Sequence, residues 1–123
     1  MGLLEQIYEK AKENPQRIAF PEAVNEKMMQ AAYETGKEGY IIPVLVGYAD
    51  EIREALSSKG YEEDIFTIVD IREEIYKKKL IDRYVALPYT LLKDKALNRR
   101  MQDPLYYAMA MEAVGEEDVT FAG

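Results

Sequence analysis

The chemistry open to this chain is limited by two residue types that its sequence lacks. It contains no histidine and no cysteine. Their absence excludes the commonest general base and metal ligand, thiolate nucleophiles, disulfides and cysteine metal sites. Acid–base or binding chemistry must therefore come from carboxylates, lysine, arginine, hydroxyl groups or backbone amides. We predict no metal site and no covalently bound cofactor, and we assign no catalytic residue.

Several residues that could bind a ligand stand directly after apolar runs of sequence. If those runs are parallel strands, their carboxyl ends share one edge of a sheet, and open α/β sheets bind ligands beyond that edge. The positions are Glu22 after residues 17–20, Gly47 and Asp50 after residues 41–46, and Asp70 after residues 65–69.

Each of these positions has a structural interpretation as well as a functional one. We expect Asp50 to cap the helix that follows it, since aspartate is a favoured N-cap residue. The same role is the favoured interpretation of Asp70, and a catalytic base is the alternative. Gly47 is predicted to form a tight strand-to-helix turn, where a glycine would also let a phosphate approach the backbone closely.

Composition indicates one compact domain over residues 1–123, with 48% hydrophobic residues. The chain has 23 acidic and 16 basic residues, and its net charge of -7 repels nucleic-acid backbones. Its first residues are amphipathic and charged, unlike a signal peptide, and no apolar run approaches the length of a membrane span. We predict a cytoplasmic protein without nucleic-acid or membrane partners.

Apolar runs alternate with helical patterns along the whole chain. Strands alternating with helices form right-handed crossovers and a mainly parallel sheet. We predict an α/β fold, a three-layer sandwich of about four strands with helices on both faces. Strands are expected at 17–20, 41–46, 65–69 and from 119, and helices at 3–11, 25–36, 50–60, 71–85, 91–101 and 105–114.

The last predicted helix is apolar nearly all round, and Glu112 is its one charged side chain. Asp103 is expected to cap it, Pro104 to occupy its first position and Gly115 to follow its end. Such a helix suits a position between layers or at an interface. The sequence then closes on an apolar run without a following helix. We therefore expect cover from a second copy in a homo-oligomer or from a C-terminal domain that is missing here.

Five short segments follow one another in a characteristic order and spacing: Phe20 to Ala23, Lys27 to Ala32, Val44 to Gly47, Ile68 to Asp70 and Asp103 to Ala108. Together they resemble the phosphate acetyl/butyryltransferase family, and the resemblance covers essentially the whole chain. That family exchanges acyl groups between coenzyme A and phosphate, in two α/β domains with the active site between them. The resemblance implies that this chain is the N-terminal domain of such an enzyme.

The resemblance also implies three binding residues for coenzyme A or acyl-CoA as substrate: Lys27, Glu22 and Gly47. Lys27 stands where family members usually carry an arginine that helps to hold the phosphates of coenzyme A. Lysine keeps the charge but loses the planar fork, and a solvated surface lysine is the alternative interpretation. Glu22 belongs to the family's Pro-Glu dipeptide, where it anchors the loop or shapes the cleft.

Two departures from the family pattern lead us to expect no activity from this chain alone. The family arginine before the Asp-Pro-Leu-Tyr motif aligns with Leu87, and the nearest arginine is Arg83. The family's Gly-rich loop and the second domain's catalytic groups would come after Gly123. Two alternatives stay open: a non-catalytic interaction or dimerisation module, and a half-domain that binds coenzyme A or a nucleotide.

Overall fold

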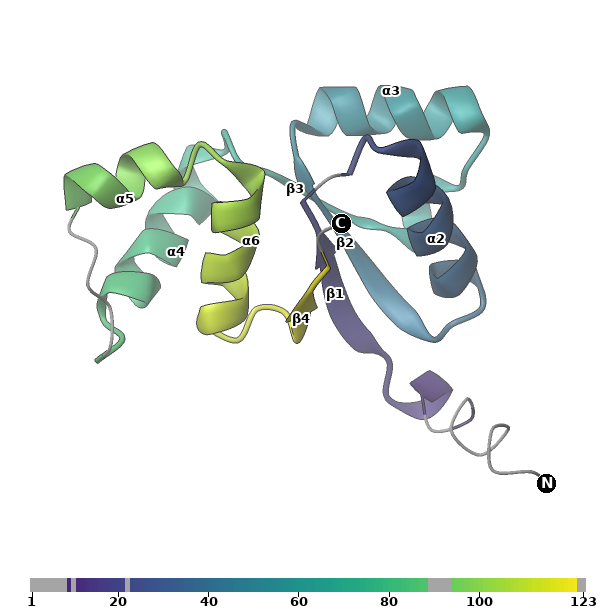
Figure 1. The fold of residues 1–123 in the computed structure, drawn as a ribbon, viewed down its shortest axis with the longest axis horizontal. Coiled ribbons are helices and arrows are strands. Elements are labelled where there is room, and N and C mark those ends of the chain that lie inside the picture. The colour runs from purple at the N-terminus through teal and green to yellow at the C-terminus, as the bar shows by residue number, and fades with distance from the viewer. Residues whose placement is uncertain (1–8, 10, 22, 89–93, 122–123) are drawn as a thin grey trace.

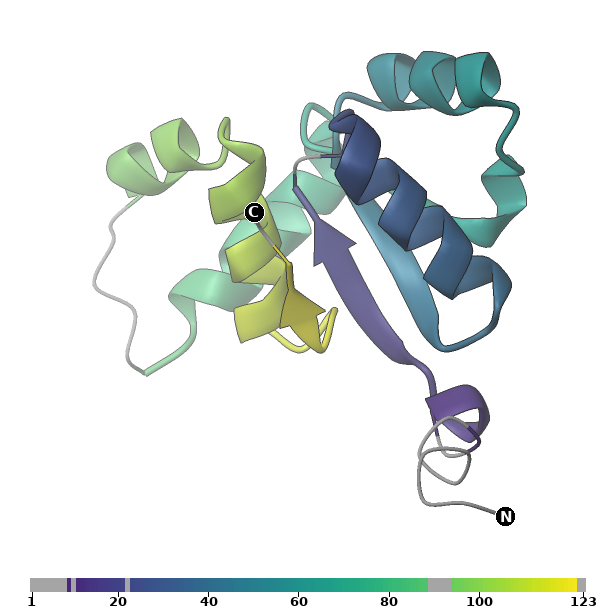
Figure 2. The same cartoon turned by 45° about the vertical axis from the view of Figure 1, so that its right-hand side comes forward.

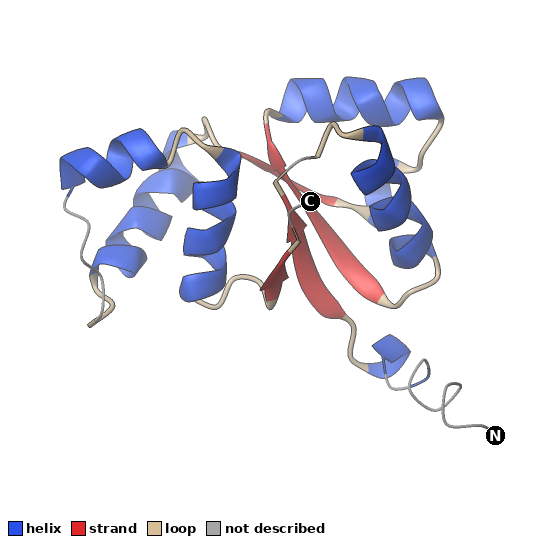
Figure 3. Cartoon of the chain, viewed as in Figure 1, coloured by secondary structure: helices blue, strands red, loops and turns tan. Residues whose placement is uncertain are grey.

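A computed structural model describes residues 9, 11–21, 23–88 and 94–121. Four parallel strands form one sheet in the order β3-β2-β1-β4. Helices lie on both faces of the sheet (Figure 1, Figure 3), so the predicted α/β sandwich is confirmed. The strands are β1 (Gln16–Phe20), β2 (Ile41–Gly47), β3 (Thr67–Asp70) and β4 (Val119–Thr120), and the helices are α2 (Glu26–Lys37), α3 (Ala49–Lys59), the 3-10 turn η1 (Glu63–Ile65), α4 (Glu74–Val85), α5 (Asp94–Arg100) and α6 (Pro104–Ala113).

The sheet separates two apolar cores because successive strand residues point to opposite faces. On β2, Leu45 joins the core under α2 and α3, while Val44 and Val46 join the core under α4, α5 and α6. Buried members of the first core include Phe20, Met29, Leu45, Ile52, Leu56 and Phe66, and those of the second include Ala19, Val46, Ile71, Leu80, Met101 and Tyr107.

Local sequence signals correctly place several helix ends. The Asn25 side chain accepts hydrogen bonds from the amides of Lys27 and Met28 at 3.0 and 3.1 Å. Asp103 accepts from the Leu105 amide at 2.9 Å, with Pro104 as the first residue of α6. Just after α6, Gly115 adopts a φ of 84°, a left-handed conformation that glycine adopts without strain.

Two predicted helix caps are wrong. Helix α3 begins at Ala49, so Asp50 lies inside its first turn, and the cap residue Tyr48 makes no side-chain capping bond. Helix α4 is capped by Glu73, whose carboxylate accepts from the Ile75 and Tyr76 amides. Asp70 is not the cap of α4, because β3 continues to Asp70 and α4 starts four residues later.

The helix expected over residues 25–36 does not end at Gly36. Helix α2 continues through it to Lys37, and the chain leaves the helix at Gly39, which has a φ of 86°. A Cβ on Gly36 would come within 2.9 Å of both Pro43 Cγ and Ile65 Cγ2. Glycine is therefore needed at this position because α2 packs so closely on β2 and η1.

The remaining differences concern the ends of elements. Ile65 belongs to η1 rather than to β3, and α4 begins at Glu74 rather than at residue 71. Of the predicted helix 3–11, only residues 9 and 11 are described, and both are helical; residues 91–93 and 122–123 also lie outside the described residues. Within the part of the chain that is described, no helix combines the length and apolar character needed to cross a bilayer.

Helix α6 is covered largely by its own chain. Tyr107, Ala108, Ala110 and Met111 are buried against the sheet and α4. Met109 is 52% exposed on the outer side of the helix. An interface on this outer side stays a prediction.

Candidate functional site

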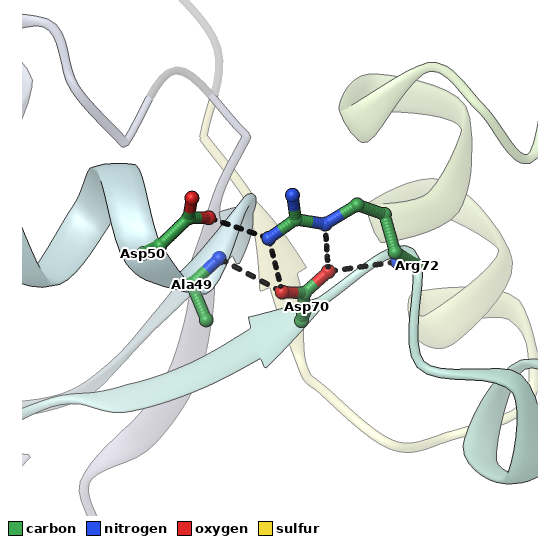
Figure 4. A network of polar contacts seen from close by, with 4 residues as sticks. All are labelled: Ala49, Asp50, Asp70 and Arg72. Carbon is green, nitrogen blue, oxygen red and sulfur yellow. Dashed lines mark hydrogen bonds and ion pairs between the residues drawn. The ribbon is translucent and has the colours of Figure 1, made fainter.

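The carboxyl ends of β2 and β3 carry the best-defined polar cluster of the described residues. It joins Asp70 at the end of β3, Arg72 two residues later, and Ala49 and Asp50 in the first turn of α3. Figure 4 shows the guanidinium group of Arg72 lying between the two carboxylates. We call Asp50, Asp70 and Arg72 the strand-end cluster.

Asp70 is the centre of this cluster. Its Oδ2 accepts a hydrogen bond from the Ala49 amide at 3.1 Å and one from Arg72 Nη2 at 2.8 Å. Its Oδ1 accepts from the Arg72 amide at 2.8 Å and from Arg72 Nε at 3.0 Å. Arg72 Nη2 also donates to Asp50 Oδ1. The cluster therefore ties the start of α3 to the turn that leads into α4.

The charges of the strand-end cluster stabilise one another. The hydrogen bond from Arg72 holds the pKa of Asp70 well below its usual range, and it also lowers the pKa of Asp50. A general base works best with a pKa near the operating pH. Asp70 is a poor proton acceptor in this state, so its geometry favours an anchoring role over the catalytic alternative.

Arg72 is further restrained by an aromatic ring. Its guanidinium carbon lies 4.7 Å from the centre of the Tyr48 ring, within the range of a cation–π contact. The backbone supports the same connection, because the Ile71 amide donates to the carbonyl of Gly47 at 2.9 Å. The turns after β2 and β3 thus form one cross-linked unit.

A cavity of about 620 Å³ lies beside the strand-end cluster, over the outer edge of β3. Its lining comes from α3 on one sheet face and from α4 on the other, with Ile68 and Val69 between them. Arg53, one of its cations, already pairs with Glu63 at 3.3 Å. Asp70 and Arg72 of the strand-end cluster line this cavity, whereas Lys27 and Gly47 do not.

The structure places Lys27 in the exposed first turn of α2. This turn follows the carboxyl end of β1, as expected. The amides of Lys27 and Met28 already donate to the Asn25 side chain. An anion near this helix start would therefore meet the ammonium group of Lys27 rather than these two amides.

Gly47 lies at the sheet edge where the sequence places it. Gly47 is the last residue of β2, pairs with Asp70, and has none of the positive φ angles found at Gly39, Gly60 and Gly115. A Cβ on Gly47 would meet Ile52 Cδ1 at an ordinary 3.5 Å. The strand-to-helix turn is tight, as predicted, because α3 begins at Ala49, two residues after β2 ends. Neither φ nor the space around Gly47 requires glycine at this position. Glu22 lies outside the described residues.

Arg83 has a structural role in the fold. It donates from Nη2 to the Val114 carbonyl at 2.7 Å, and its other terminal nitrogen pairs with Glu116. It therefore holds the connection between α6 and β4. Among the described residues, no group of three or more acidic side chains is arranged to hold a metal ion.

Sequence reasoning missed the strand-end cluster as a unit. The sequence pattern predicts a helix cap at Asp50 and at Asp70, and it gives no role to Arg72. The two-residue spacing of Asp70 and Arg72 is a local signal for a side-chain-to-backbone turn. Nothing in the spacing points to Asp50, because it is 22 residues from Arg72.

Comparison with known proteins extends over the whole chain. Residues 2–123 match the family model described as phosphate acetyl/butaryl transferase. A phosphate acetyltransferase of Acetivibrio thermocellus is 34% identical over 128 residues, covering 100% of this chain and 37% of the relative. One from Thermoanaerobacterium thermosaccharolyticum is 31% identical with the same coverage. The chain thus spans about 37% of the length of these curated relatives.

Solved structures agree on the fold. A phosphotransacetylase from Streptococcus pyogenes superposes with a TM-score of 0.83 at 22% identity, over 98% of this chain and 37% of that protein. The match corresponds to the N-terminal part of such enzymes. The family resemblance inferred from the sequence motifs is confirmed.

Proposed function

The chain belongs to the phosphate acetyl/butaryl transferase family, and we propose that it forms one part of a site for acyl transfer between coenzyme A and phosphate. The supporting observation is the family match over residues 2–123, together with relatives named phosphate acetyltransferases. We propose acetyl as the acyl group on the same ground, and the cytoplasm as the location. Residues beyond the matched 37% of the relatives would complete the site.

The geometry supports Lys27 as the contact to a phosphate of coenzyme A. Its side chain is exposed at the start of α2. The positive end of the helix dipole favours anions at this place. The neighbouring Glu26 pairs with Lys59 at 3.2 Å. Lys27 itself forms no ion pair with the described part of the chain, so its charge is available to a ligand.

Replacing Lys27 with alanine should weaken binding of coenzyme A to the purified chain. Loss of one charge-assisted contact costs about 1.5 kcal/mol, which corresponds to roughly a tenfold higher Kd. Isothermal titration with coenzyme A measures the change. Lys37→Ala is the matched control, because it removes the same charge at the opposite end of the same helix, and its Kd should stay near that of the parent.

The titration has two outcomes that contradict the assignment. No heat with either the parent or the variant would remove coenzyme A binding by this chain. Equal weakening by Lys27→Ala and Lys37→Ala would show that net charge, rather than a contact at the start of α2, governs the interaction.

The 123-residue chain alone should form no acetyl phosphate from acetyl-CoA and phosphate. Attack of the coenzyme A thiol on acetyl phosphate needs a base to take the thiol proton, the reverse reaction needs the conjugate acid, and both need fixed donors for the phosphate charge. Asp70 is a weak base because Arg72 lowers its pKa. Release of free coenzyme A, followed with a thiol reagent, measures the rate. Sustained turnover by the isolated chain would contradict the proposal that further residues complete the site.

A non-catalytic interaction module is the second candidate function. Two observations favour it. The side chains of Leu105 and Met109 are exposed on the outer side of α6, and Leu87 stands where the family pattern has an arginine. The proposed partner is a second copy of the chain. Dimers in light scattering together with no heat from coenzyme A would favour this function over the first.

A further inference from the structure

Glu117 is a buried carboxyl in the short connection between α6 and β4. Only 2% of its surface is exposed. Its Oε1 accepts a hydrogen bond from Thr120 Oγ1 at 2.9 Å, whereas Oε2 is buried without a hydrogen-bond partner among the described residues. Burying an ionised carboxylate with an unsatisfied oxygen is far more costly than burying the neutral acid.

The cations near this connection are occupied elsewhere. Arg17 Nη2 donates to the Gly115 carbonyl at 2.9 Å, and Arg83 Nη2 donates to the Val114 carbonyl at 2.7 Å. Arg83 also pairs with Glu116. Within the described chain, neither arginine has a recorded hydrogen bond to Glu117, so its negative charge would have no bonded counter-ion.

The hydrogen-bond partner of Glu117 belongs to the strand that the connection leads into. Thr120 is the second residue of β4 and pairs with Ala19 of β1. Figure 2 shows this short strand lying along β1 beside α6. Strand β4 has two residues and adds a hydrogen bond from the Phe121 amide to the Ala19 carbonyl at 2.8 Å. A change at Glu117 therefore acts directly on a short pairing.

We propose that the protonation state of Glu117 controls the pairing of β4 with β1. With the carboxyl protonated, the side chain stays buried against Thr120 and β4 stays paired with β1. Ionisation favours exposure of Glu117 to water, which separates Thr120 from its partner and loosens the strand. The proposal concerns the pairing of β4 with β1 and does not depend on the acyltransferase assignment.

Charged groups from each neighbouring element act on this carboxyl. Burial opposes the ionised form most strongly, and Glu112 of α6 and the adjacent Asp118 also oppose it, whereas the Thr120 hydrogen bond and Arg17 of β1 favour it. On α4, Tyr76 lies within the electrostatic influence of Glu116, Glu117, Arg17 and Arg83. Burial outweighs these contributions and raises the pKa of Glu117 to about 7.

The direction of the pH effect follows from this raised value. The unfolded or opened carboxyl has an ordinary pKa of about 4.5. The contribution of Glu117 to the pairing of β4 with β1 is complete below that pH. It declines above it and is lost as the pH rises through about 7.

Hydrogen exchange of the β4 amides tests whether Glu117 controls this pairing. After correction for intrinsic exchange rates, protection of residues 119–121 should fall by on the order of tenfold between about pH 5.5 and pH 8. Protection of β2 should change much less. Glu117→Gln mimics the neutral acid and should keep β4 protected at both pH values. Glu116→Gln removes the same charge from the neighbouring residue, and its β4 protection should still fall with pH.

A second measurement keeps the test independent of how well the variant folds. Carbon NMR of the Glu117 carboxyl in the parent chain should show titration near neutrality. Titration near the ordinary glutamate value would overturn the proposal. So would an equal loss of β4 protection with pH in Glu117→Gln and in the parent.

Discussion

Replacing Leu45 with alanine is expected to lower the free energy of unfolding by about 2–5 kcal/mol. Leu45 is 0% exposed on β2, which is flanked by β1 and β3, and its side chain fills the core under α2 and α3. The substitution removes buried apolar surface and leaves a cavity that a sheet between two helices cannot close easily. Urea unfolding followed by circular dichroism measures the loss.

The control for this result is the same substitution at a half-exposed leucine. Leu105 is 39% exposed on the outer side of α6, and Leu105→Ala should cost about 1 kcal/mol or less. If both variants lost the same stability, the assignment of Leu45 to the packed centre of the sheet would be wrong.

Replacing Asp70 with alanine is expected to cost about 1.5–3 kcal/mol of stability. The variant leaves the Ala49 amide without its acceptor and removes three hydrogen bonds from Arg72. Thermal or urea unfolding measures the difference. Asp64→Ala removes an equal charge from the exposed turn η1 and should change stability by no more than about 0.5 kcal/mol.

The contribution of Asp70 should also depend on pH in a defined direction. Its pKa is lowered by Arg72 from an ordinary value of 3.8, so its stabilising effect is complete above that pH and is lost as the pH falls below it. The parent chain should therefore lose more stability than Asp70→Asn on acidification below about pH 4. Parallel acid curves for the two proteins would refute the role of this ion pair.

The fold could be predicted from the sequence because its main signals are local. Residues 41–46 are apolar on both faces of a strand, as a buried parallel strand requires, and β2 is indeed central in the described sheet. Asn25 and Asp103 bond amides two or three residues away. Such short-range bonds follow from residue type and spacing alone.

Where the prediction was wrong, the deciding contact joins distant segments. Asp50 and Asp70 both suited a helix cap, but Arg72 bonds both of them, and Asp70 also bonds the start of α3. Glycine often follows the end of a helix, but Gly36 lies inside α2, where a larger residue would collide with Pro43 and Ile65 from other elements. The position of Lys27 followed from the chain order, whereas its ligand is a family-based expectation that the coenzyme A titration tests.

The outer edge of β3 has a consequence for how copies of the chain meet one another. In the described sheet this strand has a neighbour on one side only, and an unpaired strand edge is a template for aggregation by backbone pairing. Arg53 and Arg72 flank that edge, and each is tied to acidic partners of its own chain. These two exposed, ion-paired side chains hinder strand pairing at the edge, because an incoming strand would have to displace them before reaching the backbone.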